Sequence, residues 1–193
     1  MKTDIILSGV GGQGILSIAA VIGEAALEEG MYMKQAEVHG MSQRGGDVQS
    51  NLRISDKPVA SDLIPRGKAD LIISLEPMES LRYLPFLKPG GWLVTNSEPF
   101  INIPNYPDIE TVYAELNKLP NKVVLNVDGI AKELGSVRAA NMVMLGAATP
   151  FLGIEYDKIE AGIRRIFSRK GEEIVEMNLK ALAAGYDVAK KVL

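Results

Sequence analysis

Cysteine is absent from this chain of 193 residues, and histidine occurs only once. Without thiols the chain can form no disulfide framework, carry no catalytic thiol and hold no iron–sulfur cluster through thiolates. A self-contained zinc site of the usual kind needs more histidine or cysteine ligands than the sequence offers, so we expect no metal site. Any redox cofactor must therefore be bound without thiolates or lie on another polypeptide.

A basic surplus is also lacking, because 21 Lys and Arg residues face 24 Asp and Glu residues and the formal net charge is −3. The basic residues are scattered and form no stripe with interleaved aromatic residues. This balance gives no electrostatic reason to expect nucleic acid or an anionic membrane as a partner.

Long apolar runs are missing as well. The most apolar stretch, Met142–Ile154, contains Thr149 and Pro150 and is shorter than the roughly 20 apolar residues that span a bilayer. The chain passes from Met1 and Lys2 almost directly into an apolar run, without the pattern of a signal peptide. We therefore expect a cytoplasmic protein without a membrane segment.

Short apolar runs alternate with helical patterns along the chain. The runs typical of buried strands are Asp4–Ser8, Leu71–Leu75, Trp92–Thr95 and Val123–Val127. Helical patterns cover Ile15–Glu29 and Glu79–Leu87 and fill the last third, at Tyr156–Phe167 and Glu172–Leu193.

Two further segments complete the pattern. Met31–Val38 reads as an extended segment, and Val48–Ile54 alternates apolar and polar residues, which is typical of a half-exposed strand and suits an antiparallel element. Together the segments predict one layered α/β domain over residues 1–193, with a mostly parallel or mixed central sheet and a helical C-terminal third.

The first apolar run ends in a glycine loop, Gly9–Gly14. Its residues Gly9, Gly11 and Gly14 have the G-x-G-x-x-G spacing, and Gly12 and Gln13 fill the remaining positions. Glycines permit close backbone approach, and the free amides of a following helix attract anions. A bound nucleotide or phosphate, a tight turn that binds nothing, and a wall of an inter-subunit active site remain open. For a dinucleotide, Glu37 is the candidate for the acid that binds the ribose.

The loop Glu37–Gly46, after the second extended segment, is dense in polar groups. In a parallel sheet it lies at the carboxyl edge beside the glycine loop, where ligands of such folds bind. Arg44 suits bidentate recognition of a carboxylate or phosphate. A solvated loop with a hydrogen-bonded histidine is the alternative, and no catalytic residue can be assigned. The candidate ligand or subunit-contact residues of this loop are Glu37, His39, Ser42, Gln43, Arg44, Gly45 and Gly46.

Polar residues also follow the later strands. Glu76, Asn96 and Asp128 each come shortly after a predicted strand and can line the same crevice, although Asn96 and Asp128 are equally ordinary cap residues. Asn141 precedes an apolar run and reads as a buried polar anchor.

Three segments carry a family resemblance. The opening Ile6–Ile15, the loop Glu37–Gly46 and the run Asn141–Gly146 together resemble the γ-type domain of 2-oxoacid:ferredoxin oxidoreductases, over essentially the whole chain. The His-Gly-Met-Ser-Gln-Arg-Gly-Gly form of the second loop is most similar to the small (β) subunits of indolepyruvate oxidoreductases.

The resemblance implies a subunit that is inactive alone. The complete enzyme of this family decarboxylates a 2-oxoacid oxidatively with coenzyme A as co-substrate and passes electrons to ferredoxin. The resemblance places thiamine diphosphate and the [4Fe–4S] clusters on a large partner subunit, so this chain binds no cofactor by itself. It also implies that Gly9–Gly14 and Glu37–Gly46 face the partner or the channel for substrate and coenzyme A.

Two other functions compete with this interpretation. A self-sufficient dinucleotide-binding oxidoreductase would use Gly9–Gly14 and bind a nicotinamide or flavin cofactor by itself. A non-enzymatic scaffold domain would pair as a homodimer through the apolar stripe of Glu172–Leu193. The identity of the 2-oxoacid is not encoded in these motifs.

Overall fold

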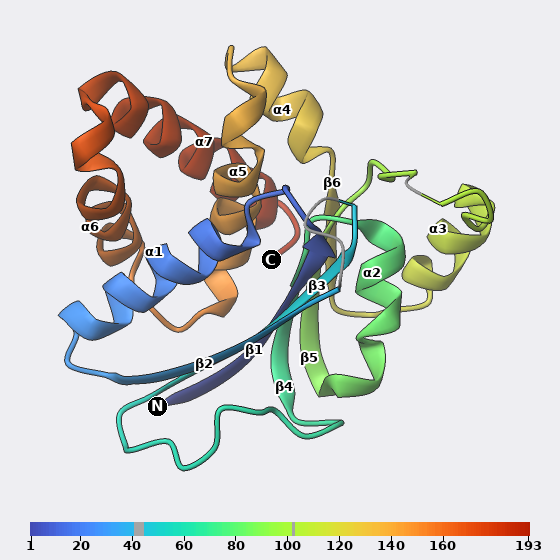
Figure 1. Cartoon of the computed structure of the whole chain (residues 1–193), viewed down its shortest axis with the longest axis horizontal. Coiled ribbons are helices and arrows are strands. Elements are labelled where there is room, and N and C mark those ends of the chain that lie inside the picture. Colours follow the sequence, from blue (N-terminus) through green and yellow to red (C-terminus); the bar gives the residue numbers. More distant parts are fainter. Residues whose placement is uncertain (41–44, 102) are drawn as a thin grey trace.

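The first strand of the chain lies in the middle of the sheet. The computed structural model describes residues 1–40, 45–101 and 103–193, and its strands follow the order β2-β3-β1-β4-β5-β6 (Figure 1). The strands are β1 (Lys2–Val10), β2 (Tyr32–His39), β3 (Asp47–Ser55), β4 (Ala69–Ser74), β5 (Leu87–Asn96) and β6 (Lys122–Leu125). The parallel pairs are β1–β4, β4–β5 and β5–β6, whereas β3 is antiparallel to both β1 and β2. The predicted mostly parallel, mixed sheet is confirmed.

Helices cover both faces of this sheet. The α-helices are α1 (Ile15–Glu28), α2 (Pro77–Arg82), α3 (Ile109–Asn117), α4 (Val127–Glu133), α5 (Ala140–Ala148), α6 (Tyr156–Phe167) and α7 (Glu172–Lys190). Short 3₁₀ turns are η1 (Leu84–Phe86), η2 (Val137–Ala139), η3 (Thr149–Phe151) and η4 (Ser168–Lys170).

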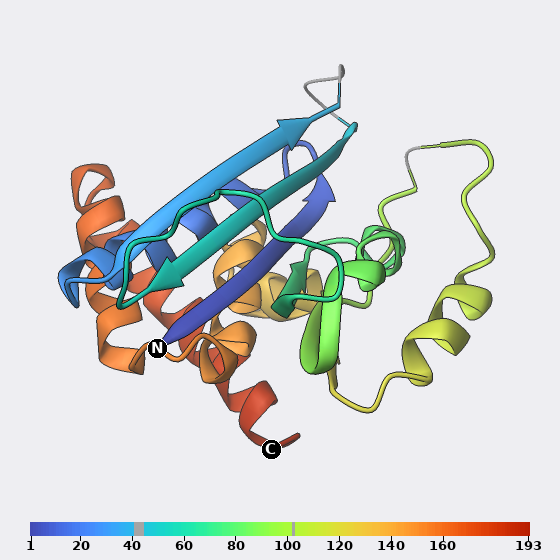
Figure 2. The ribbon, with the colours of Figure 1, turned by 90° about the horizontal axis from the view of Figure 1, so that it is seen from below.

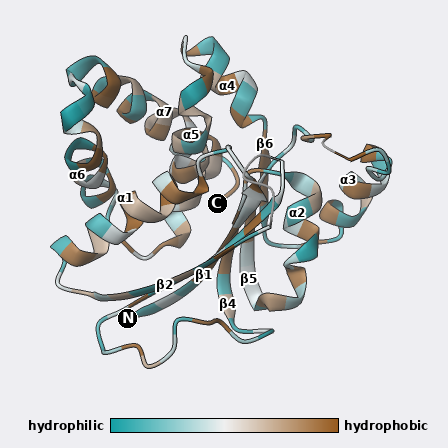
Figure 3. Ribbon diagram, in the orientation of Figure 1, coloured by the Kyte–Doolittle hydropathy of each residue, from teal (hydrophilic) through white to brown (hydrophobic). Residues whose placement is uncertain are grey.

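The alternation of side chains along the strands divides the core into two layers. Ile5 and Leu7 of β1 join the apolar residues of α1, α5, α6 and α7, whereas Ile6 joins those around α2 and α3. Figure 3 shows hydrophobic residues along the central strands and more hydrophilic ones on outer helices such as α6. Within the described residues, no helix combines the length and apolar character needed to cross a bilayer.

The prediction of a half-exposed strand at Val48–Ile54 is wrong in its exposure. β3 lies between β1 and β2, and even Asn51 on its polar side is buried. The connection between β3 and β4 covers that side, because Asn51 Oδ1 accepts a bond from Ile64 N at 3.1 Å and Arg53 Nη1 donates to Leu63 O at 3.0 Å. Asn51 and Arg53 therefore pair with backbone groups of this connection, and Arg53 also donates to the Asp4 carboxylate.

The predicted boundaries of three elements are also wrong. The helix expected over Glu79–Leu87 begins earlier and ends at Arg82, after which Pro85 lies in η1, and Pro89-Gly90-Gly91 belong to β5. The strand expected to reach Val127 ends at Leu125, because Asn126 caps α4 by accepting a bond from Gly129 N at 2.6 Å. Gly9, expected in the glycine loop, belongs to the central strand β1.

The helical C-terminal third is confirmed, but its apolar stripe is an internal one. Val175 and Leu182 of α7 are buried in the core with α5, so the stripe offers no surface for the homodimer considered above. In α6, Ile159, Ile163 and Phe167 are buried, whereas Ile166 is 37% exposed. This helix packs against both α1 and α7, and Phe167 is buried on the same side of the core as those helices.

Glycines let α5 and α7 touch through their backbones. A Cβ at Gly146 would lie 2.8 Å from Leu182 C and 2.9 Å from Tyr186 N, and a Cβ at Gly185 would lie 2.9 Å from Ala147 N. Each helix therefore places a glycine against the main chain of the other.

Ionisation of Tyr83, in the core layer around α2 and α3, makes the free energy of unfolding depend on pH. Burial raises the pKa of Tyr83 to about 12 from the ordinary 10.0, with the Asp47 and Glu79 carboxylates adding to the shift. The fold favours the neutral phenol, so the contribution of Tyr83 to stability is complete below pH 10 and is lost as the pH rises through about 12. We expect Tyr83→Phe to flatten this alkaline fall in the free energy of unfolding. Urea unfolding between pH 8 and 12 measures it, with the exposed Tyr32→Phe as control; an unchanged alkaline slope in Tyr83→Phe would contradict the prediction.

Candidate functional site

The glycine loop is held in place by its one side chain with polar groups. Gln13 Oε1 accepts a bond from Val10 N at 2.7 Å, and Gln13 Nε2 donates to Leu75 O at 3.0 Å. Gln13 therefore ties the end of β1 to the end of β4. Gly14, with φ of 88°, turns the chain into α1 in a left-handed conformation that favours glycine.

Asn141 braces the start of α1 from the far end of the sequence. Its Nδ2 donates to Gly14 O at 3.2 Å, and a Cβ on Gly14 would lie 2.5 Å from that nitrogen. The amides of the first turn of an α-helix lack partners within the helix and carry the positive end of its dipole. The loop thus places an amide-rich helix start at the carboxyl edge of the sheet.

The two loops singled out from the sequence are neighbours, as predicted. Gly11 N donates to Gly46 O at 2.8 Å, and Gly45 N donates to Gly11 O at 3.4 Å. In β2, the Glu37 carboxylate lies next to the imidazole of His39, whose side chain is 55% exposed. Ser42, Gln43 and Arg44 lie outside the described residues.

The position of Glu37 does not suit the ribose of a dinucleotide. In the dinucleotide fold the first two strands are neighbours, so the acid at the end of the second strand lies beside the glycine loop. Here β3 is inserted between β1 and β2, which moves Glu37 two strand spacings, about 10 Å, from β1. This topology removes one required part of the dinucleotide fingerprint.

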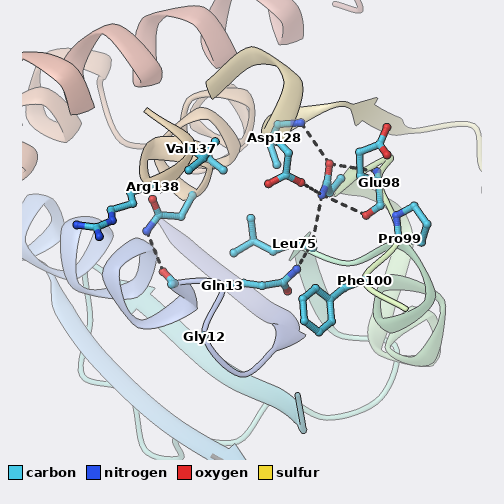
Figure 4. Close-up of a pocket in the computed structure, with 14 residues that line it drawn as sticks. Gly12, Gln13, Leu75, Glu98, Pro99, Phe100, Asp128, Val137 and Arg138 are labelled. Atoms are coloured by element: carbon cyan, nitrogen blue, oxygen red, sulfur yellow. Dashed lines mark hydrogen bonds between the residues drawn. The ribbon is translucent and has the colours of Figure 1, made fainter. Parts of the chain in front are cut away.

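A crevice of about 520 Å³ opens at the carboxyl edge (Figure 4). It lies where β1 leads into α1 on one face of the sheet and β4 leads into α2 on the other. Ligands of open α/β sheets bind at such switch points. The lining residues come from the segments after β1, β4, β5 and β6 and from the region of η2 and α5: Gly12, Gln13, Gly14, Leu75, Asn96, Glu98, Pro99, Phe100, Val127, Asp128, Val137, Arg138, Ala140 and Asn141.

Asn96 organises the floor of this crevice. Its side chain is buried, and Nδ2 donates to Asp128 Oδ2 at 2.9 Å, to Glu98 O at 3.3 Å and to Leu75 O at 3.4 Å. Its Oδ1 accepts bonds from Val127 N at 3.2 Å and from Glu98 N at 3.3 Å. One amide therefore joins the ends of β4 and β5 to the start of α4.

The walls of the crevice combine apolar and charged groups. Phe100 and Val137 are 46% and 64% exposed, and Arg138 supplies a cation close to the start of α1 (Figure 4). The described lining has no hydroxyl, imidazole or amine side chain, and its titratable groups are the carboxylates of Glu98 and Asp128 and the guanidinium of Arg138. The helix amides and Arg138 can hold an anionic group, and Phe100 and Val137 an apolar part.

The sequence predicted the edge of the sheet at which the crevice lies, but it identified only some of the residues that line the crevice. Gly12, Gln13 and Gly14 of the predicted loop line the crevice, together with Asn96 and Asp128, which were expected at this edge. Asn141, expected as a buried polar anchor, lines it as well. Glu37 and His39 do not. Glu76 is buried behind the wall, and Arg138, Phe100 and Val137 carried no signal of their own. In the described part of the chain, no cluster of three or more histidine, aspartate or glutamate side chains could hold a metal ion.

Comparisons with known proteins agree on one family. Residues 4–188 match the sequence family described as pyruvate ferredoxin/flavodoxin oxidoreductase. The chain is 40% identical to indolepyruvate oxidoreductase subunit IorB of Archaeoglobus fulgidus over 98% of this chain and 96% of that protein. The γ subunit of a keto/oxoacid ferredoxin oxidoreductase from Geobacter sulfurreducens has a similar structure, with a TM-score of 0.72, 28% identity and coverage of 98% and 99%.

A longer protein contains the same fold as one part. The 2-oxoglutarate:ferredoxin oxidoreductase of Magnetococcus marinus, solved with 2-oxoglutarate, coenzyme A and succinyl-CoA bound, matches 100% of this chain with 32% of its own. The TM-score is 0.78 and the identity 23%, a level that supports a shared fold.

Proposed function

We propose, from the premise that this chain belongs to the pyruvate ferredoxin/flavodoxin oxidoreductase family, that it completes an enzyme which decarboxylates an arylpyruvate oxidatively. The chain is a non-cluster subunit of a 2-oxoacid:ferredoxin oxidoreductase of the indolepyruvate type. The products are the aryl-acetyl-CoA, carbon dioxide and reduced ferredoxin. The observation that carries the substrate class is the 40% identity to an indolepyruvate oxidoreductase subunit across nearly the full length of both chains.

The cofactors belong to the partner in this proposal. The chain has no cysteine, so its residues do not suit a thiolate-held [4Fe–4S] cluster. We assign the clusters and thiamine diphosphate to a large partner subunit, through which electrons reach ferredoxin. In this proposal the chain binds and orients the substrate or coenzyme A within a cytoplasmic complex.

The carboxyl edge is the part of this chain that we assign to the shared active site. The crevice offers the amides at the start of α1 and the Arg138 guanidinium for an anionic group, and Leu75, Phe100 and Val137 for an apolar part. Coenzyme A has both parts, so we propose that this crevice, with the loops Gly9–Gly14 and Glu37–Gly46, faces its channel or the partner. The isolated chain should then bind neither NAD(H) nor flavin.

Reconstitution tests the proposal. The chain co-expressed with its large partner should reduce methyl viologen only when an arylpyruvate and coenzyme A are both present, and neither subunit should do so alone. Titration of the isolated chain with NAD(H), NADP(H) and flavins is the control. Saturable cofactor binding by the chain alone, or a complex that does not turn over arylpyruvates, would contradict this function.

Arg44→Ala should impair turnover of the assembled complex. A guanidinium can bind a carboxylate or phosphate bidentately, so we expect kcat/KM to fall about tenfold, equivalent to about 1.4 kcal/mol. Steady-state kinetics of the purified complex measure the loss. Arg66→Ala, at an exposed arginine between β3 and β4 near the opposite edge of the sheet, is the matched control. Unchanged activity and unchanged assembly in Arg44→Ala would remove this residue from the site.

A further inference from the structure

A buried carboxylate outside the crevice holds one of the crevice walls. Glu76 follows β4, is 0% exposed and lines no part of the crevice itself. Its Oε2 accepts a bond from Glu79 N at 2.8 Å, which caps α2. A cap alone would not require the second oxygen to be buried.

The second oxygen reaches the segment that forms the wall. Glu76 Oε1 accepts bonds from Phe100 N, at 3.3 Å, and from the Tyr106 hydroxyl. Both donors lie in the connection between β5 and α3, which Figure 2 shows standing away from the sheet. Ile101 and Ile103, between the two donors, are 72% and 36% exposed, so apolar burial does not hold this stretch.

We propose that Glu76 is a positioning residue that fixes Phe100 at the mouth of the crevice and thereby sets how tightly the crevice holds its ligand. This inference rests on the proposed function for the identity of that ligand, coenzyme A. The bond from Phe100 N acts next to the wall, and the bond from Tyr106 secures the other side of the same stretch. Burial, and then the hydrogen bond to Glu76, raise the pKa of Tyr106, so its phenol stays a donor at neutral pH.

Tyr106→Phe separates this role from helix capping. The substitution removes the hydroxyl donor and leaves both the Glu76 carboxylate and the bond from Glu79 N in place. The matched control is Tyr113→Phe, which removes from α3 a phenol that donates to Ser97 O at 2.8 Å, and neither Tyr113 nor Ser97 lines the crevice.

Two measurements on these variants test the proposal. Tyr106→Phe removes the bond from the Tyr106 hydroxyl to the charged Glu76 acceptor and so loosens the stretch that contains Phe100. In the isolated chain, exchange of the Phe100 amide hydrogen should therefore quicken about tenfold, while the Glu79 amide stays protected. In the reconstituted complex, KM for coenzyme A should rise about threefold or more with kcat within about twofold of the wild type. Tyr113→Phe should change neither.

Each failure has a separate meaning. Unchanged exchange at Phe100, or changed exchange with an unchanged KM, would overturn the positioning role. A wild-type complex without arylpyruvate- and coenzyme A-dependent turnover would instead reject the proposed function, and the exchange measurement would still decide whether Glu76 holds Phe100.

Discussion

Gly146→Ala should destabilise the chain by about 3 kcal/mol or more, at or above the top of the usual range for overpacking a core. The added Cβ would lie 2.8 Å from Leu182 C and 2.9 Å from Tyr186 N, and both are backbone atoms that cannot turn aside as a side chain would. To relieve the clash, α5 must move away from α7 and open the layer that contains Met144 and Leu182. With a total stability of about 5–15 kcal/mol for a typical domain, this loss removes a large fraction.

Gly23→Ala is the matched control for this prediction. Gly23 is also a buried helix glycine, in α1, but the Cβ there would meet the end of the flexible Met33 side chain, with Sδ at 2.5 Å, which can rotate away. Alanine is also the better helix former by up to about 1 kcal/mol. Urea unfolding of both variants should show a large loss for Gly146→Ala and little change for Gly23→Ala. Equal midpoints would show that α5 and α7 can separate without cost.

Asn96→Ala should cost about 2–4 kcal/mol of stability and most of the turnover of the complex, because it strips partners from buried polar groups. Val127 N and Leu75 O each lose a hydrogen bond, and the Asp128 carboxylate loses its donor at 2.9 Å. The ends of β4 and β5 would then no longer be tied to α4, and the floor of the crevice would lose its shape.

Asp128→Ala isolates one of these bonds. The substitution removes the Asn96–Asp128 contact but leaves the other bonds of Asn96 in place. Because Asp128 is exposed, we expect a loss of stability below about 1 kcal/mol. Thermal unfolding and steady-state turnover of both variants measure the difference. The central role of Asn96 fails if its alanine variant unfolds at the wild-type temperature.

The sequence predicted the place of the site because that place depends on local patterns. A strand that ends in glycines and leads into an apolar helix predicts the loop at Gly14, and the second polar loop was expected beside it, as Gly11 and Gly46 confirm. The same patterns could not show that Gln13 bonds Leu75 O, because that contact depends on which strand pairs with β1.

Residues that act through contacts distant in the sequence could not be predicted for the same reason. Alternation in β3 predicted an exposed face, but the cover comes from Ile64 and Leu63, which lie further along the chain. Arg138 and Phe100 reach the crevice from irregular segments without periodicity. Gly146 and Gly185 look like ordinary helix residues until the two helices are placed against each other.

The central position of β1 has a consequence for how the chain is made. β1 is synthesised first, yet Val10 pairs with Asp47 of β3 and Ser8 with Ser74 of β4. Until Ser74 has left the ribosome, the edge of β1 that will meet β4 has unpaired amides and carbonyls, and such edges recruit other strands. Pairing over long sequence separations is also slow. Newly made chains should therefore pass through a period of vulnerability to aggregation that ends only when the strand on each side of β1 is in place.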